Sequence, residues 1–254
     1  MSARKQHEQK LLRILISFHE RYPAAGLDAL VDMIRKESPC SRNTVHRLMK
    51  LYNIHSIRKR AFKITTNYKH NYVVSPNLLK RDFTAVKPNQ KWVGDITYIH
   101  TDEGRIYAAI VKDLCLKKIV GYAFSSRIDT NLMVSALKMA VNSQRPQNDL
   151  IFHSDRGVQY ASYGYREVLS EYNITQSMSR KGEPYDTAVA ENFFICLKCE
   201  LVHHKHYKTR SEAQADIFAY IEAYYNSVRP QSALNWLSQV EYEHLLSIYA
   251  AKVA

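Results

Sequence analysis

The sequence lacks long apolar runs, a cysteine framework and acidic residues to balance the bases of its first third. No apolar run in the 254 residues approaches the roughly 20 that a membrane-spanning helix requires. The N-terminal stretch carries charges among its apolar residues, which argues against a signal peptide. The four cysteines are too few and too irregularly spaced for a disulfide framework. We therefore expect a reduced, cytoplasmic protein, associated with the nucleoid if it binds DNA.

The basic charge lies entirely in the first third of the chain. Residues 1–90 hold 18 Lys and Arg against 6 Asp and Glu, whereas residues 91–254 hold 18 of each. This asymmetry predicts a polyanion-binding region attached to a neutral body. The charge distribution alone is explained equally well by a solvated basic surface that keeps the protein soluble.

Apolar spacing predicts three short helices in the basic region, residues 1–62. The third begins after Ser41, a favourable N-cap, and carries apolar residues on one face. Its opposite face is basic and polar, with Arg42, Arg47 and Lys50, and the run at 57–63 adds Arg58, Lys59 and Arg60. This arrangement predicts a helix-turn-helix that binds DNA phosphates. Short helical triplets also occur in proteins that never bind DNA.

Residues 63–90 show little periodicity and contain two prolines, so we interpret them as a linker. The body, residues 91–254, begins with three short strands that predict an antiparallel meander, at 91–101, 104–115 and 117–128. A helix, a nearly continuous apolar strand at 149–155, a second helix, a last strand at 174–179 and a helix from Ala188 follow. The pattern predicts an α/β fold with a mixed five-stranded sheet flanked by helices.

Three carboxylates occupy unusual places in this body. Asp95 lies within a strand, where acids are depleted, Asp155 ends the fourth strand, and Glu191 opens the helix after it. If the first and fourth strands are neighbours, Asp95 and Asp155 lie side by side. Three such acids repel unless a hard cation neutralises them, so the set predicts a site for two Mg²⁺ ions acting on a phosphodiester.

Each acid taken alone also fits an ordinary structural role. Asp95 fits an exposed edge position, Asp155 a helix cap, and Glu191 the favourable start of a helix. To explain all three acids by such ordinary roles, in a chain with a basic N-terminal region, requires three coincidences. Cys196, Cys199 and the histidines that follow do not form a zinc pattern, because a helical apolar face already accounts for both cysteines.

Four stretches resemble the catalytic core of insertion-sequence transposases with a DDE triad: WVGDITYI, HSDRGVQYAS, SRKGEPYDTAVAENFFICLKCE and YNSVRPQSAL. These transposases are relatives of retroviral integrases with a ribonuclease H-like fold. The 35 residues between Asp155 and Glu191 match the family's D-D-35-E spacing. More closely, the chain is similar to the second-frame product (OrfB) of the IS-three family over nearly its whole length.

The resemblance implies that Asp95, Asp155 and Glu191 are the catalytic, metal-binding triad. The implied ion is Mg²⁺, with Mn²⁺ as a substitute. Lys198 shares the helix face of Glu191 and is the first candidate for contact with DNA phosphate. Arg156, Arg180 and Lys181 flank the site as further candidates. No cofactor other than metal is implied.

The implied activity is metal-dependent nicking of DNA at transposon ends and strand transfer by the freed 3′-hydroxyls. The implied partners are double-stranded DNA, further copies of the chain, and an upstream-frame (OrfA-type) product or fusion. The family often shows Asp-Asn-Ala before the last acid, and here Thr187 replaces the asparagine. We expect that this change does not touch the triad.

Two other functions use the same features. A ribonuclease H-like nuclease needs the same acids but only hydrolyses. A non-catalytic DNA-binding regulator explains the basic region and leaves the three acids without a role.

Overall fold

The computed structural model describes residues 3–58, 72–147 and 149–253. The chain divides into two compact units, one of residues 1–60 with 227–254 and one of residues 61–226. The domain boundaries expected from the sequence, including a linker at 63–90, stay a prediction. Among the described residues, no helix is both long enough and apolar enough to cross a lipid bilayer.

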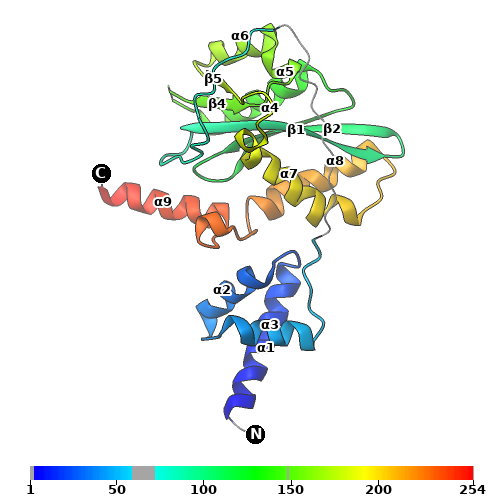
Figure 1. The fold of residues 1–254 in the computed structure, drawn as a ribbon, viewed down its shortest axis with the longest axis vertical. Helices are drawn as coiled ribbons and strands as arrows, with labels where there is room; N and C mark the ends of the chain where they lie inside the picture. The colour runs from blue at the N-terminus through cyan, green and yellow to red at the C-terminus, as the bar shows by residue number, and fades with distance from the viewer. Residues whose placement is uncertain (1–2, 59–71, 148, 254) are drawn as a thin grey trace. The chain divides into compact units, whose positions relative to one another are not determined.

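The N-terminal region is entirely helical, as predicted. Its helices are α1 (Ala3–Arg21), α2 (Leu27–Glu37) and α3 (Arg42–Leu51) (Figure 1). They share an apolar core of residues such as Leu15, Leu30 and Val45. Ser41 caps α3 by accepting a 3.1 Å hydrogen bond from the main-chain N–H of Thr44. Val45, Leu48 and Met49 of α3 are buried in this core, whereas its basic residues Arg42, Arg47 and Lys50 are exposed.

The second unit is built on a mixed five-stranded sheet with the strand order β3-β2-β1-β4-β5. The strands are β1 (Lys91–Thr101), β2 (Gly104–Asp113), β3 (Ile119–Ser125), β4 (Ile151–Ser154) and β5 (Thr175–Met178). The first three form the predicted antiparallel meander, whereas β4 runs parallel to β1 and β5 parallel to β4. The predicted fold class is confirmed.

Helices cover both faces of the sheet (Figure 1). One face packs against α4 (Thr130–Gln144), α5 (Val158–Ala161) and α6 (Tyr163–Glu171). The other packs against α7 (Ala188–Glu200), α8 (Arg210–Ala219) and the π-helix Tyr220–Tyr225 that continues α8. Neighbours along β2 alternate between these cores, since Ala109 and Val111 belong to the first and Ala108 and Ile110 to the second. The last helix, α9, spans Gln239–Val253.

Two glycines allow unusually close packing in the sheet. A Cβ on Gly121 of β3 would lie 2.3 Å from the carbonyl oxygen of Ala136, so α4 lies directly against β3. A Cβ on Gly94 of β1 would lie 2.4 Å from the ring of Phe152 in β4. Gly94 therefore leaves room for the ring of Phe152 between β1, which carries Asp95, and β4, which Asp155 directly follows.

Residues 72–90 run to the start of β1 without forming a helix or strand. This segment follows the edge strand β5: the N–H of Leu78 donates to Ser177 Oγ at 2.9 Å, and the N–H of Met178 donates to the carbonyl of Pro76 at 3.3 Å. Leu79 is buried beside Val93 and Leu114. The path of the segment brings its side chains close to the loop that leads into α7.

Candidate active site

Asp95 lies on β1, and Asp155 directly follows the adjacent parallel strand β4. The register of β1 and β4 pairs Val93 with His153, and Asp95 and Asp155 each come two residues later in the chain. Parallel strands advance in step, so this register brings both carboxylates to one level of the sheet. Asp155 is 8% exposed, and Asp95 is half-buried. The structure thus meets the condition under which the two acids were expected to lie side by side.

Main-chain amides orient both carboxylates. Asp95 Oδ1 accepts a 2.8 Å hydrogen bond from the N–H of Ile96, and Asp155 Oδ1 accepts one of 2.8 Å from the N–H of Gly157. A Cβ on Gly157 would lie 3.0 Å from Asp155 Oδ1. A larger residue there would therefore press on the carboxylate that the turn orients.

Glu191 belongs to the first turn of α7, which begins at Ala188. Its side chain is exposed, and Glu191 Oε1 accepts a 2.6 Å hydrogen bond from Thr187 Oγ1. The expectation that the replacement at Thr187 does not touch the triad is therefore wrong. An i, i+4 pair at a helix start brings the two side chains together.

Three charged side chains, those of Asp155, Glu191 and Lys198, influence the carboxyl of Asp95. Burial raises the pKa of Asp95 well above its usual range, the charge of Asp155 raises it further, and Glu191 adds a smaller rise that Lys198 opposes. Burial lowers the pKa of Lys198, and Asp95 counteracts this effect. Lys198 Nζ lies 5.6 Å from the ring centroid of Tyr98. Asp95 is thus influenced by the charges of three residues that are far from it in the sequence.

The three acids match the donor preference of a hard divalent cation. They offer only carboxylate oxygens, which suit Mg²⁺ better than a soft metal. Within residues 3–58, 72–147 and 149–253, no three His, Cys, Asp or Glu side chains are gathered closely enough to hold a metal ion. The donor set fits Mg²⁺ by its chemistry.

His153 does not face the acids. It is buried, with Nδ1 2.8 Å from Ser177 Oγ and Nε2 3.0 Å from the main-chain carbonyl of Asp186. Burial lowers the pKa of His153, which favours the neutral ring. Both ring nitrogens of His153 therefore have hydrogen-bond partners within the fold.

The basic candidates near the site differ in their surroundings. Arg156 Nε donates to the carbonyl of Ser179 at 2.6 Å, and Arg180 forms a 2.9 Å ion pair with Asp186. Lys181 is exposed. Contact of these residues and of Lys198 with DNA stays a prediction.

On the exposed face of α3, Arg42 pairs with Asp28 at 2.7 Å and Arg47 with Glu8 at 2.6 Å. Lys50 and Arg58 are exposed. The remaining candidates, Lys59 and Arg60, lie outside the described residues. DNA contact by this set stays a prediction as well.

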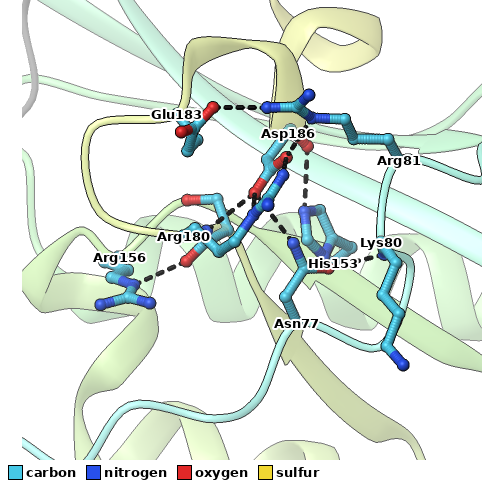
Figure 2. A network of polar contacts seen from close by, with 9 residues as sticks. Asn77, Lys80, Arg81, His153, Arg156, Arg180, Glu183 and Asp186 are labelled. Carbon is cyan, nitrogen blue, oxygen red and sulfur yellow. Dashed lines mark hydrogen bonds and ion pairs between the residues drawn. The ribbon is translucent and has the colours of Figure 1, made fainter.

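Sequence reasoning missed Asp186, a buried acid two residues before the start of α7. Figure 2 shows the guanidinium groups of Arg180 and Arg81 converging on its carboxylate, with Asn77 beside them. Asp186 is only 1% exposed. The only local signal for Asp186 in the sequence was its place directly before Thr187, where the family often has asparagine.

Family models match most of the chain. A model described as "Integrase core domain" covers residues 85–184, a second of that description covers 191–245, and one described as "HTH-like domain" covers 5–62. The chain is 40% identical to the "Insertion element IS600 uncharacterized 31 kDa protein" of Shigella sonnei, over 93% of this chain and 88% of that protein. It is 37% identical to "Transposase InsF for insertion sequence IS3A" of Escherichia coli (strain K12), over 96% of this chain and 85% of that protein.

The chain belongs to the transposase family of IS3-type insertion sequences. The function of this transposase is DNA transposition, and its activity is of the polynucleotidyl transferase type. The fold agrees with a solved structure, the simian T-cell lymphotropic virus intasome in complex with the PP2A regulatory subunit B56 gamma. That likeness has a TM-score of 0.54 at 15% identity, over 91% of this chain and 74% of that chain. The expected ribonuclease H-like integrase fold and helix-turn-helix region are confirmed.

Proposed function

We propose that this transposase is a DDE enzyme whose catalytic residues are Asp95, Asp155 and Glu191. Water first attacks a phosphodiester at each transposon end: its oxygen forms a bond to phosphorus as the bond from phosphorus to the 3′ oxygen breaks, which leaves a 5′-phosphate on one strand end and a 3′-hydroxyl on the other. That hydroxyl then attacks a second phosphodiester, forming one P–O bond as another breaks. Because each cut strand end is itself the nucleophile, no covalent enzyme–DNA intermediate is needed.

One observation carries this proposal: the register of β1 and β4 brings Asp95 and Asp155 to one level of the sheet, where the charges of Asp155 and Glu191 raise the pKa of Asp95. Such repulsion destabilises the fold unless the acids have a ligand of opposite charge. An arrangement that costs stability at a place without a structural role is typical of a functional site. The adjacent strands β1 and β4, rather than flexible side chains, bring the acids together.

We infer that the three carboxylates hold divalent cations, two Mg²⁺ ions for which Mn²⁺ substitutes. When bound, such ions activate a water or 3′-hydroxyl and stabilise the leaving oxygen of the phosphodiester. The N–H groups of Ile96 and Gly157 orient two of the carboxylates for that role.

Lys198 has a separate role in this proposal. Its ammonium group acts on Asp95, shares a helix face with Glu191, and is held near the ring of Tyr98. A cation in this place holds a DNA phosphate against the acids. The basic face of α3 positions the duplex through its phosphates, which do not by themselves specify sequence.

The active form is proposed to be a homo-oligomer that binds two transposon ends, together with an upstream-frame product that supplies further DNA recognition. This part of the proposal rests on family membership. Gel filtration with and without end DNA, and with the upstream-frame product added, measures both associations.

The reaction is tested with labelled DNA that carries the end of the element, in the presence of Mg²⁺ or Mn²⁺. The proposal expects nicks at the element boundary followed by joined products, and neither with DNA whose end is scrambled. Cleavage without joining or end preference would identify a hydrolytic nuclease instead. No metal-dependent reaction, even with the upstream-frame product fused, would leave only DNA binding.

A further inference from the structure

The carboxylate of Asp186 is surrounded by hydrogen-bond donors from separate parts of the chain. Both of its oxygens accept, and all five donors lie between 2.8 and 3.2 Å away. The donors are the main-chain N–H, Nε and Nη2 of Arg180, Nε of Arg81 and Nδ2 of Asn77. Each of Asn77 and Arg81 is separated from Asp186 by more than 100 residues of chain.

The orientation of the surrounding groups is itself fixed. Asn77 Oδ1 accepts a 2.9 Å hydrogen bond from the N–H of Lys80, so its Nδ2 must face Asp186. Figure 2 shows both bonds, and it shows His153 close to the main chain of Asp186. Through His153 the network reaches β4, the strand that ends beside Asp155.

In the neutral form that burial favours, His153 has one consistent pattern of hydrogen bonding, because the carbonyl of Asp186 can only accept. Ser177 Oγ accepts from the N–H of Leu78, so its own proton is available for His153 Nδ1. The protonated nitrogen is then Nε2, which donates to the carbonyl of Asp186. The side chain and the main chain of Asp186 are therefore both held, by different partners.

The next residue connects Asp186 to the proposed catalytic acid. The carbonyl of Thr187 accepts from the N–H groups of Ala190 and Glu191 at 3.0 and 3.1 Å, which starts α7. The hydroxyl of Thr187 donates to Glu191 Oε1 at 2.6 Å. A displacement of Asp186 thus shifts both the main chain and the carboxylate of Glu191.

The hydrogen bonds to Asp186, those of Arg180 first, outweigh its desolvation and hold its pKa well below its usual range. The network therefore stabilises the charged carboxylate, and because five donors reach its two oxygens it also fixes the geometry of that carboxylate closely. Arg81 and Arg180 remain 45% and 49% exposed, so the network places two flexible cations at the surface around one buried acid. What such a network provides is a defined position for the start of α7.

We propose that Asp186 is a positioning residue that fixes Glu191 relative to Asp95 and Asp155, with Asn77, Arg81, Arg180 and His153 as its supports. The inference rests on the proposed metal-binding role of the three acids. In this account the main role of Arg180 is to hold the carboxylate of Asp186, and any contact of Arg180 with DNA is an additional role.

The test compares Asp186→Asn with Glu183→Gln in the full-length chain. Glu183 lies in the same loop and pairs with Arg81, but it does not contact Asp186 by its side chain. Metal binding is measured without DNA, as the Mg²⁺ or Mn²⁺ concentration that produces half of the maximal rise in Tm. Nicking of end DNA provides kcat and KM. Asp155→Asn is measured in parallel.

We expect Asp186→Asn to raise the half-maximal Mg²⁺ concentration and to lower kcat, each by about 10-fold, which is the lower end of the range for residues that orient metal ligands. KM for DNA is expected to change less than about twofold, and Glu183→Gln to match the wild type. A purely structural role lowers the amount of active protein but leaves the metal midpoint in place. A raised KM with an unchanged metal midpoint would show instead that the network serves DNA binding and would overturn the inference.

Arg180→Gln provides the second variant, because its half-exposed side chain can be replaced without unfolding the loop. It is expected to raise the metal midpoint about threefold, less than the 10-fold of Asp186→Asn because Arg81 and Asn77 remain. If Asp186→Asn does not fold, an unchanged midpoint in Arg180→Gln overturns the inference. If Asp155→Asn keeps wild-type metal binding and nicking, the proposed function fails, and the inference about Asp186 fails with it. If Asp155→Asn loses both while Asp186→Asn and Arg180→Gln match the wild type, the inference about Asp186 alone fails.

Discussion

The hydroxyl of Thr187 donates a 2.6 Å hydrogen bond to Glu191 Oε1 across the first turn of α7. The bond holds an exposed side chain that must be in one place for the proposed reaction. A hydrogen bond to a charged group contributes roughly 1.5–3 kcal/mol, and 1.4 kcal/mol corresponds to about tenfold in rate.

Replacing Thr187 by Ala is therefore expected to lower kcat for end nicking about tenfold, with KM for DNA unchanged. Thr187→Ser retains the hydroxyl and serves as the matched control, with a rate within about twofold of the wild type. Steady-state kinetics on labelled end DNA measure both parameters. Wild-type kcat in Thr187→Ala would show that this bond does not position Glu191.

A second prediction concerns the stability of the metal-free protein. The raised pKa of Asp95 means that the folded protein holds a proton that the unfolded chain loses near its ordinary pKa, about 3.9. Stability therefore falls as the pH rises from that value to the raised pKa, and the penalty is fully present above it. Asp95→Asn removes the penalty.

In EDTA at pH 7, Asp95→Asn is expected to raise Tm by a few degrees, since about 1 kcal/mol shifts a domain of this size by roughly 2–4 °C. Added Mg²⁺ raises the Tm of the wild type and has little effect on the variant. Differential scanning fluorimetry with both buffers checks this. A lower Tm for Asp95→Asn in EDTA would contradict repulsion among the acids.

The close approach of β3 and α4 provides a third prediction. Gly121→Ala would place a methyl group 2.3 Å from the main-chain oxygen of Ala136, which cannot move without shifting α4. Overpacking of this kind costs about 1–3 kcal/mol. At Gly164 of α6 the nearest atom, on Thr130, is 4.0 Å away, so Gly164→Ala is neutral or stabilising. Urea unfolding of the two variants measures the difference, and equal stability would contradict the packing described for β3.

The proposed phosphate contacts of α3 lead to a fourth prediction. Lys50 is exposed on the basic face, whereas Lys36 of α2 lies 3.7 Å from Asp32. Lys50→Gln is expected to weaken binding to end DNA and to nonspecific DNA alike, and to reduce the slope of log K against log salt by about 1. Lys36→Gln is the control. Fluorescence anisotropy at several salt concentrations tests this, and an unchanged slope in Lys50→Gln would exclude a phosphate contact.

Much of the fold was predictable because its signals are local. The alternation in residues 91–101 predicted β1 with the bounds that the structure has, and Ser41 and Ala188 marked the starts of α3 and α7. The pairing of β1 with β4 was the condition for Asp95 and Asp155 to lie side by side, and the register meets it.

The supports of the site were not predictable in the same way. Asn77 and Arg81 contact Asp186 from a segment without periodicity, and only the tertiary structure brings it beside the loop. The bond between Thr187 and Glu191 was accessible in principle, because residues four apart at a helix start are neighbours. It was missed because the residue change was judged by its place in a motif and not by its place on the helix.

The central claim is that Asp95, Asp155 and Glu191 are one catalytic centre. Asp155→Asn tests it most directly, with Glu167→Gln, an exposed change on α6, as the matched control. In the Mg²⁺-dependent assay on end DNA, the account predicts that Asp155→Asn loses nicking and joining together, by more than the roughly 10–100-fold that changes around a metal site cost. Glu167→Gln keeps both. Nicking or joining by Asp155→Asn at the wild-type rate, in a variant that still binds end DNA, would contradict the claim.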